Sequence, residues 1–498
     1  MSPILQPPSD TTPACLRLRG VPRAREGAVD VDRLVAWLSP CDLLEDVRGW
    51  SHVVPHDGAV LSDDGRTSHL RGTEGADLAL GDDPLAALDA VAELAGLDPH
   101  DRAEAPGPLR GGLVGALSYD LGRRIERIDP RARTDRPGPT LHLRHVDVVV
   151  AVPPARDRAL ALASPSGLAR RTPRERVTAL QSRLSAVAAA PPPMVTTRAP
   201  APQVVTTSLP HEQHLAAVGS LLAAIGAGRA FQVNLSQRLT ARWPGGTHDL
   251  YRALRAHSPA PHGAALPDIG LASVSPETFL EVSGGRIVSA PIKGTRRRAD
   301  DPALDAALAD DLTTSEKDRA ENVMIVDLVR NDLGRVCRTG TVRVEELAGL
   351  ASHPTVWHLV SRVAGWLTPA TTYGQLLAAT FPCGSVTGAP KVAAMQLIED
   401  HEPVRRSWYC GSVGYLGHGN ARLSVGIRTA VRSGRGRVDY GAGGGIVADS
   451  TPEAEHAETL DKAAAFLRAV NAVRIVGTGS TARPTGIAAA GRRPAASR

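Results

Sequence analysis

The chain has 498 residues, of which 42% are hydrophobic and 22% charged, a composition typical of a globular protein with room for two or three domains. The net charge of +5 comes from scattered arginines, and 6 Trp, 6 Tyr and 4 Phe leave little for base stacking, so nucleic acid is not an expected partner. No run approaches the roughly 18 apolar residues of a membrane helix, no signal peptide is recognisable, and the five cysteines form no C-x-x-C, which predicts a cytoplasmic protein with no membrane partner.

The sequence predicts five segments. Residues 1–19 form a flexible N-terminus, and residues 20–152 a folded N-terminal region in which 141–152 suits strands. Residues 153–208 are rich in Pro and Ala and predict a linker around one helix. Residues 209–475 carry most of the motifs and form the catalytic domain, and 476–498 read as a disordered tail.

Lysine is rare in this chain. Lysine and arginine together number 57, but lysine occurs only at Lys293, Lys317, Lys391 and Lys462. An ammonium can lose its proton and act as a nucleophile, whereas a guanidinium is effectively always charged. A retained lysine such as Lys293, in "APIKGTRRR", therefore marks a place where arginine does not serve. Chance retention is the alternative that the residues alone leave open.

A helix is predicted over 315–336, "SEKDRAENVMIVDLVRNDLGRV". Its apolar stripe is explained by a core contact, but its acidic residues, Glu321 among them, are not. This helix is therefore a candidate source of carboxylate ligands.

A second carboxylate-bearing helix is predicted to begin at Ser450 with a capping box. Glu455, Glu458 and Lys462 then share one face. Carboxylate oxygens suit Mg²⁺, while a solvated face with a Glu–Lys pair is the alternative.

Common motif templates do not fit the chain. The loop "TFPCGSVTGAPK" (380–391) spaces its glycines and lysine differently from a P-loop, and "GAGGGI" (441–446) lacks the last glycine of a dinucleotide fingerprint. "HEQHL" (211–215) misses the zinc pattern by one position, and no G-x-S-x-G occurs.

Seven motifs in a fixed order are specific enough to identify a family. They are "FQVNLSQR" (231–238), "SPETFL" (275–280), "PIKGTRRR" (291–298), "AENVMIVDLVRNDLGRV" (320–336), "PTVWHLVSRVAG" (354–365), "TFPCGSVTGAPKVAAMQLI" (380–398) and "GAGGGIVADSTPEAEHAETLDKA" (441–463). With them the chain closely resembles the chorismate-binding enzymes, which include component I of anthranilate synthase and of aminodeoxychorismate synthase and the isochorismate and salicylate synthases. The resemblance covers about 209–475, and "GGLVGALSYDLGR" (111–123) extends it. It implies an α/β (α+β) sandwich of two stacked, mainly antiparallel sheets with helices outside.

The resemblance also implies a ligand set. Mg²⁺ would grip the ring carboxylate of chorismate, with Glu321 and Glu458 as ligands and Glu455 as a near or water-mediated contributor. The substrate-binding residues would be Ser385, His358, Tyr409 and Arg428, the backbone around Gly443, Gly444 and Gly445, and Lys462. An arginine fork suits a carboxylate bidentately, which gives Arg428 a physical role. A hydrogen-bonded core histidine is the alternative for His358.

The branch within the family is indicated by two positions. Isochorismate-type members have a water-activating lysine where this chain has Gln232, and glutamine cannot be a base, so Gln232 is expected only to contact substrate. Anthranilate synthases usually read P-I-A-G-T around position 293, whereas P-I-K-G-T is typical of aminodeoxychorismate synthases. By resemblance Lys293 would add to C2 of chorismate as the 4-hydroxyl departs, with Glu277 as general acid, before ammonia attacks C4. A loop cation and a turn residue are the alternatives for Lys293 and Glu277.

The activity implied is that of an aminodeoxychorismate synthase component I, with ammonia from a separate glutamine amidotransferase subunit in a heterodimer. Its rivals are an anthranilate synthase component I and a non-catalytic chorismate-binding regulatory subunit. Thr278, Cys383 and Phe231 depart from common family residues without removing a proposed catalytic group. Residues 41–53 resemble a region that holds tryptophan in relatives but are too divergent to assign.

Overall fold

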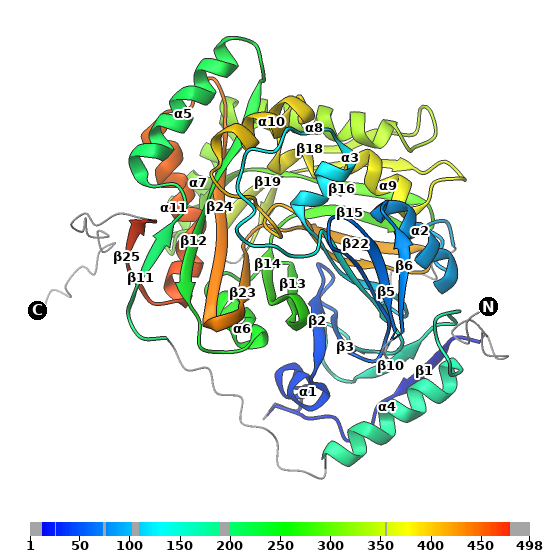
Figure 1. The fold of residues 1–498 in the computed structure, drawn as a ribbon. Helices are drawn as coiled ribbons and strands as arrows, with labels where there is room; N and C mark the ends of the chain where they lie inside the picture. Colours follow the sequence, from blue (N-terminus) through cyan, green and yellow to red (C-terminus); the bar gives the residue numbers. More distant parts are fainter. Residues whose placement is uncertain are drawn as a thin grey trace, which may run out of the picture.

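Two large β-sheets stack against each other in this computed structural model, which describes residues 12–24, 26–72, 76–101, 109–188, 200–353 and 356–478. The α-helices of the described residues lie outside the sheets (Figure 1). The predicted sandwich is therefore confirmed. Residues 1–11 and 479–498, most of the predicted flexible N-terminus and tail, lie outside the described residues.

The first sheet has 13 strands. Its order is β1 (Ala14–Arg17), β10 (Leu160–Ala163), β9 (Val149–Val152), β3 (Ser51–Pro55), β2 (Cys41–Glu45), β13 (His262–Leu266), β14 (Leu271–Ser275), β23 (Thr429–Ser433), β24 (Arg437–Ile446), β12 (Gln232–Arg242), β11 (Gln203–Thr207) and β25 (Ala472–Gly477), with β20 (Gly388–Ala389) beside β12. Strands β11 and β25 run parallel, and the other neighbours run antiparallel.

The second sheet has 12 strands. Its order is β17 (Ile292–Arg297), β19 (Val356–Trp366), β16 (Arg286–Ala290), β15 (Thr278–Ser283), β22 (Asn420–Val425), β21 (Ser412–Leu416), β7 (Gly112–Leu117), β8 (Leu141–Val146), β4 (Val60–Asp63), β5 (Ser68–Arg71) and β6 (Asp77–Gly81), with β18 (Arg343–Ser352) beside β19. Buried side chains of both sheets, among them Leu44, Val114, Ala264 and Tyr415, meet in one apolar core between them. Burial of this apolar surface holds the sheets together.

The helices cover the outer faces of the two sheets. They are α1 (Val31–Leu38), α2 (Pro84–Ala95), α3 (Gly122–Ile125), α4 (Pro173–Ala188), α5 (His211–Gly226), α6 (Thr247–His257), α7 (Pro302–Thr314), α8 (Glu316–Gly334), α9 (Tyr373–Thr380), α10 (Lys391–His401) and α11 (Pro452–Ala469). Helices α1, α4, α6 and α11 share a core with the first sheet, and α2, α8 and α9 with the second. Within the described residues, no helix is long and apolar enough to cross a bilayer.

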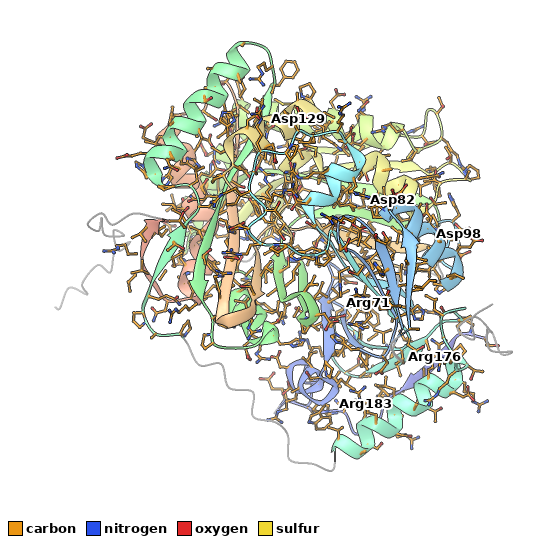
Figure 2. All side chains as sticks on the ribbon, viewed as in Figure 1. Arg71, Asp82, Asp98, Asp129, Arg176 and Arg183 are labelled. Carbon is orange, nitrogen blue, oxygen red and sulfur yellow. The ribbon has the colours of Figure 1, made fainter. Side chains whose placement is uncertain are left out.

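The segment 153–208, predicted as a linker, contributes to the sandwich. It contains the predicted helix as α4, which carries Arg176 and Arg183 (Figure 2). Arg176 donates a hydrogen bond to the Ser164 carbonyl (2.6 Å), and Arg183 donates one to the Leu38 carbonyl (3.0 Å). It also contains β10, which pairs with β1 and β9, and β11, which pairs with β12 and β25. Strand β1 in turn lies within the predicted flexible N-terminus. Composition did not indicate these short strands because their partners lie far away in the sequence.

The start of α11 differs from the predicted capping box. Thr451 is the N-cap residue, and no side chain caps the helix. Ser450 instead accepts a hydrogen bond from the Val447 N–H (3.1 Å) and donates one to Glu455 Oε1 (2.6 Å). The prediction that Ser450 begins the helix is therefore wrong, and its hydroxyl orients a carboxylate instead.

Candidate active site

A cavity of about 540 Å³ gathers most of the residues predicted for the site. Its lining includes Glu277, Lys293, Glu321, His358, Ser385, Tyr409, Arg428, Gly443, Gly445, Glu455, Glu458 and Lys462. Gly444 and Gln232 are not part of the lining but lie next to it: a Cβ on Gly444 would be 3.0 Å from Glu455 Oε2, and one on Gly445 would collide with the Gln232 amide. Residues separated by more than 200 positions thus meet at one place.

One wall of the cavity is the glycine-rich end of β24. The strand pairs with β12 along its whole length, from Arg437 to Ile446, but with β23 only as far as Tyr440. Its remaining backbone groups on that side therefore face the cavity rather than a neighbouring strand. Glycine is required here for close approach, because a side chain at 441 would overlap the Tyr409 ring and one at 445 would lie 3.4 Å from Lys293 Nζ.

Lys293 lies on β17, at the edge of the second sheet. The pairing of β17 with β19 shifts register between Lys293 and Thr295, because Gly294 adopts a positive φ of 83°. The Asn322 side chain donates to the Lys293 carbonyl (3.1 Å), so α8 holds this bulge in place. Burial raises the pKa values of Glu277 and Glu321, and the positive charge of Lys293 opposes both rises. For Glu458 burial also acts to raise the pKa, while Lys462 and then Lys293 lower it. Lys293 therefore lies within electrostatic reach of all three carboxyls.

Glu277 follows β14 and is only 4% exposed. Burial raises the pKa of Glu277 to about 7, against the hydrogen bond from Ser385 and the positive charge of Lys293. Its Oε1 has no hydrogen-bond partner among the described residues. A carboxyl with this pKa is partly protonated at neutral pH and can donate its proton to a group in the cavity.

Two further side chains of the cavity wall are Arg428, which carries positive charge, and His358. Although burial lowers the pKa of Arg428, a guanidinium remains charged at neutral pH, and its Nη1 donates to the Ser258 hydroxyl (2.9 Å). His358 Nδ1 lies 2.9 Å from the Thr295 hydroxyl, and burial together with Arg428 lowers the pKa of His358 to about 4, so the ring is neutral. The histidine is therefore both hydrogen-bonded and part of the cavity wall, next to Arg428.

The three predicted metal ligands come from α8 and α11. Burial raises the pKa of Glu321 and of Glu455, and Glu455 Oε2 has no partner among the described residues. For Glu458, burial acts to raise the pKa, but the Lys462 ammonium at 2.7 Å outweighs it and the pKa is lowered. Lys462 also donates to the Gly443 carbonyl (3.0 Å). The Glu–Lys pair considered from sequence is thus present, at the cavity wall, with both side chains about half exposed to solvent.

The acidic groups suit a hard cation in chemistry but do not form a ready-made metal site. Within the described residues, no three acidic, histidine or cysteine side chains are arranged to hold an ion. The raised pKa values and the unpartnered Glu455 oxygen are features that a bound cation would relieve, and Mg²⁺ prefers such oxygen ligands. The residues therefore fit Mg²⁺, and its binding stays a prediction.

Sequence reasoning missed one lysine of the cavity. Lys317, at the start of α8, lines the wall beside Asp318, so three of the four lysines are in the site. The rarity of lysine was a signal that could have found it. The fourth, Lys391, is structural, because its ammonium pairs with Asp332 (2.7 Å) and donates to the Thr380 carbonyl (2.9 Å).

The site and fold define a cleft lined by charged and polar side chains between two mainly antiparallel sheets. The chain belongs to the chorismate binding enzyme family, whose sequence model matches residues 43–468. The match begins well before residue 209, in agreement with an N-terminal region that contributes strands to both sheets.

Relatives with two different names are similar to the chain. It is 38% identical over 413 residues to "Aminodeoxychorismate synthase component 1" of Klebsiella aerogenes, covering 82% of this chain and 88% of the relative. It is 39% identical over 421 residues to "Anthranilate synthase component 1" of Mycobacterium bovis, covering 80% of each chain. The crystal structure of anthranilate synthase component I from Streptococcus pneumoniae superimposes with a TM-score of 0.71 at 28% identity, covering 83% of this chain and 91% of that one. The specific reaction must therefore be argued from the site.

Proposed function

We propose that the protein is an aminodeoxychorismate synthase component I, which converts chorismate and ammonia to 4-amino-4-deoxychorismate and water in the cytoplasm. A separate glutamine amidotransferase subunit would supply the ammonia, as the "component 1" in the relatives' names suggests. The observation that carries the proposal is Lys293, an amine that faces the cavity among the carboxyls of Glu277, Glu321 and Glu458.

Substrate binding follows from the charges of the cavity wall. Arg428 would hold the enolpyruvyl carboxylate, with Tyr409 and the exposed backbone of β24 beside it. Glu321 and Glu458 would hold Mg²⁺ with Glu455 nearby, and the ion would supply positive charge for the ring carboxylate. Gln232, buried beside Gly445 with both amide atoms unpartnered, would be free to contact the substrate.

The chemistry would proceed by two displacements. After the Lys293 ammonium has given its proton to solvent, the free amine forms a bond to C2 while the ring double bonds shift and the C4–O bond breaks, and Glu277 gives its proton to the departing hydroxyl, which leaves as water. Ammonia then forms a bond to C4 as the C2–nitrogen bond breaks and Lys293 is released. An arginine at 293 could not serve, because a guanidinium stays protonated.

This proposal is tested by product analysis. The full chain is incubated with chorismate, Mg²⁺ and an ammonium salt, and the products are identified by mass and chromatography for the wild type and for Lys293→Ala. We expect aminodeoxychorismate from the wild type and a loss of at least about 10²-fold in the variant, the scale typical of removing a catalytic group.

The second candidate is an anthranilate synthase component I, which the Mycobacterium bovis relative supports at a similar identity. In that reaction ammonia attacks C2, and no lysine nucleophile is needed. Formation of anthranilate that survives Lys293→Ala would favour it. Complete absence of turnover with ammonia would instead favour a non-catalytic chorismate-binding subunit.

A further inference from the structure

A second cavity, of about 570 Å³, lies directly behind the candidate active site. The two cavities share Tyr409, Tyr440 and Gly441 as a common wall. The second cavity opens between β23 and β24 on one side and the segments around residues 135–139 and 402–408 on the other. Its volume is in the range of small-molecule binding sites, and the proposed reaction makes no use of it.

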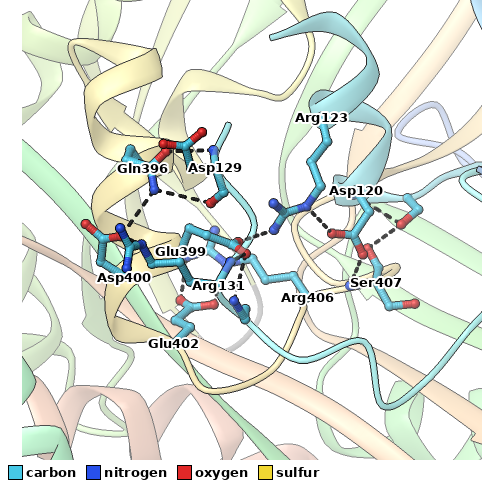
Figure 3. A network of polar contacts seen from close by, with 12 residues as sticks. Asp120, Arg123, Asp129, Arg131, Gln396, Glu399, Asp400, Glu402, Arg406 and Ser407 are labelled. Atoms are coloured by element: carbon cyan, nitrogen blue, oxygen red, sulfur yellow. Dashed lines mark hydrogen bonds and ion pairs between the residues drawn. The ribbon is translucent and has the colours of Figure 1, made fainter. Parts of the chain in front are cut away.

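The acidic residues that line this cavity are already paired. Asp135 pairs with Arg238, Asp439 with Arg136, Glu402 with Arg406, and Asp268 with Arg144. Figure 3 shows Glu402 and Arg406 in the polar network that joins α10 to the segment 120–131. These carboxylates therefore have little capacity left to neutralise further positive charge.

Two arginines of the lining remain without a partner. Arg405 and Arg432 make no ion pair and no side-chain hydrogen bond with the described residues, and the Nε atom of each is buried. The positive charge of Arg405 opposes the rise that burial causes in the pKa of Asp120, and this carboxylate is itself paired with Arg123 (3.1 Å). Leaving these buried Nε–H donors unsatisfied is unfavourable, and both half-buried guanidinium groups are available to an acceptor in the cavity.

The rest of the lining mixes polar residues with apolar surface, and the apolar surface is both aromatic and aliphatic. Trp408, Tyr409 and Tyr440 contribute aromatic surface, and Pro139, Pro267, Ile269 and Val431 contribute aliphatic surface. Unpaired guanidinium groups beside such surface match a ligand with a carboxylate at one end and a flat apolar body at the other, because an arginine fork binds a carboxylate bidentately.

We propose that this second cavity binds a small aromatic carboxylate, held by Arg405 and Arg432 against the Trp408–Tyr440 side. The site is distinct from the one that binds chorismate in the proposed function and does not depend on which product is formed. Because the Tyr409 ring lies directly against Gly441, in the wall between the cavities, a ligand in the second cavity contacts the back of the active-site wall.

The test is calorimetric titration of the full chain with benzoate, in the absence of chorismate. Arg405→Gln and Arg432→Gln should each weaken binding about 10- to 100-fold, the loss expected when a charged hydrogen-bond donor is removed.

Arg362→Gln serves as the matched control, because Arg362 is exposed on β19 and lines neither cavity. Arg428→Gln separates the two cavities, because Arg428 lines only the first. Benzylamine tests the charge requirement with the same ring.

The second site is supported if benzoate still binds to Arg362→Gln and to Arg428→Gln and if benzylamine does not bind. The proposal is overturned if the wild type gives no saturable heat, if Arg428→Gln abolishes binding while Arg405→Gln does not, or if benzylamine binds as well as benzoate. Thermal melts of each variant ensure that a lost signal does not reflect unfolding. Since no turnover is measured, failure here is distinguishable from failure of the proposed function.

Discussion

The chemistry of the site depends on a few residues whose properties are set by burial. Glu277 is buried with one oxygen unpartnered, which raises its pKa to about 7, while Lys293 is kept on a bulged edge strand whose backbone Asn322 holds. An acid that keeps its proton near neutral pH and an amine at one cavity wall are the two groups that a displacement at chorismate needs.

We expect Glu277→Gln to lower the turnover number about 10²- to 10⁴-fold, because the departing hydroxyl loses its proton donor. In the wild type the protonated form of Glu277 is the active one, so the rate should fall as pH rises through about 7. The residual activity of the variant should lack this decline. A pH–rate series on both proteins measures it, and an unchanged decline in the variant would assign the titration to another group.

Burial of Glu277 should also affect stability. Its pKa in the folded state, about 7, exceeds the ordinary value of 4.5, so the folded state binds more protons between these values and stability is lost as pH rises through that interval. A neutral glutamine avoids this loss. Glu277→Gln should therefore melt at a higher temperature than the wild type at pH 8, with a smaller difference at pH 4.5. Thermal melts at the two pH values check the sign.

At the level of elements, the site is built where β24 loses one neighbour and α8 and α11 bring in carboxylates. The glycine run of β24 is the end of the strand itself, with β12 paired along it. Glycines are needed in this stretch, because Tyr409, Gln232 and the α11 carboxylates pack closely against its backbone.

Gly445→Ala tests this close packing. The added methyl group would collide with the Gln232 amide and lie 3.4 Å from Lys293 Nζ, so we expect activity to fall at least about tenfold while the fold is retained. Gly219→Ala on α5 is the matched control, because its Cβ would meet nothing within 4 Å and alanine favours a helix by up to about 1 kcal/mol. Steady-state kinetics and thermal melts of both variants distinguish the outcomes, and full activity in Gly445→Ala would contradict the role given to this wall.

Local patterns predicted the parts of the structure that depend on local physics. The periodicity of 315–336 predicted α8, and ordered motifs identified the residues of the cavity. Strand β11 was not predicted, because its parallel partner β25 lies more than 250 residues away and its own composition resembles a linker. The Glu458–Lys462 contact could not be chosen from spacing alone, since several pairings on one face of α11 were possible, and the Ser450–Glu455 contact depends on the turn that precedes the helix.

At the scale of the whole molecule, the N-terminal region and the motif-rich segment form one sandwich. Strand β2 pairs with β13 in the first sheet, and β7 pairs with β21 in the second. The core between the sheets draws residues from both regions, including Val54 and Val114 from one and Leu271 and Val413 from the other.

A fragment that begins at residue 200 should therefore not fold on its own, although it contains every proposed site residue. The fragment lacks β2 and β7. Without them β13 and β21 would become unpaired edge strands, and apolar surface of the shared core would be exposed. We expect the fragment to aggregate and the full chain to melt in one cooperative transition. Size-exclusion chromatography and calorimetry compare the two, and a monomeric, cooperatively melting fragment would contradict a shared core.

The account as a whole depends on a covalent role for Lys293, and mass spectrometry of the intact protein tests that role most directly. The wild type is mixed with chorismate and Mg²⁺ in a buffer free of ammonia, and then an ammonium salt is added. We predict a mass increase equal to chorismate less one water, located by peptide mapping at Lys293, absent in Lys293→Ala, and lost when ammonia is supplied. Normal formation of an aminated product with no adduct at Lys293, under conditions that would trap one, would contradict the account.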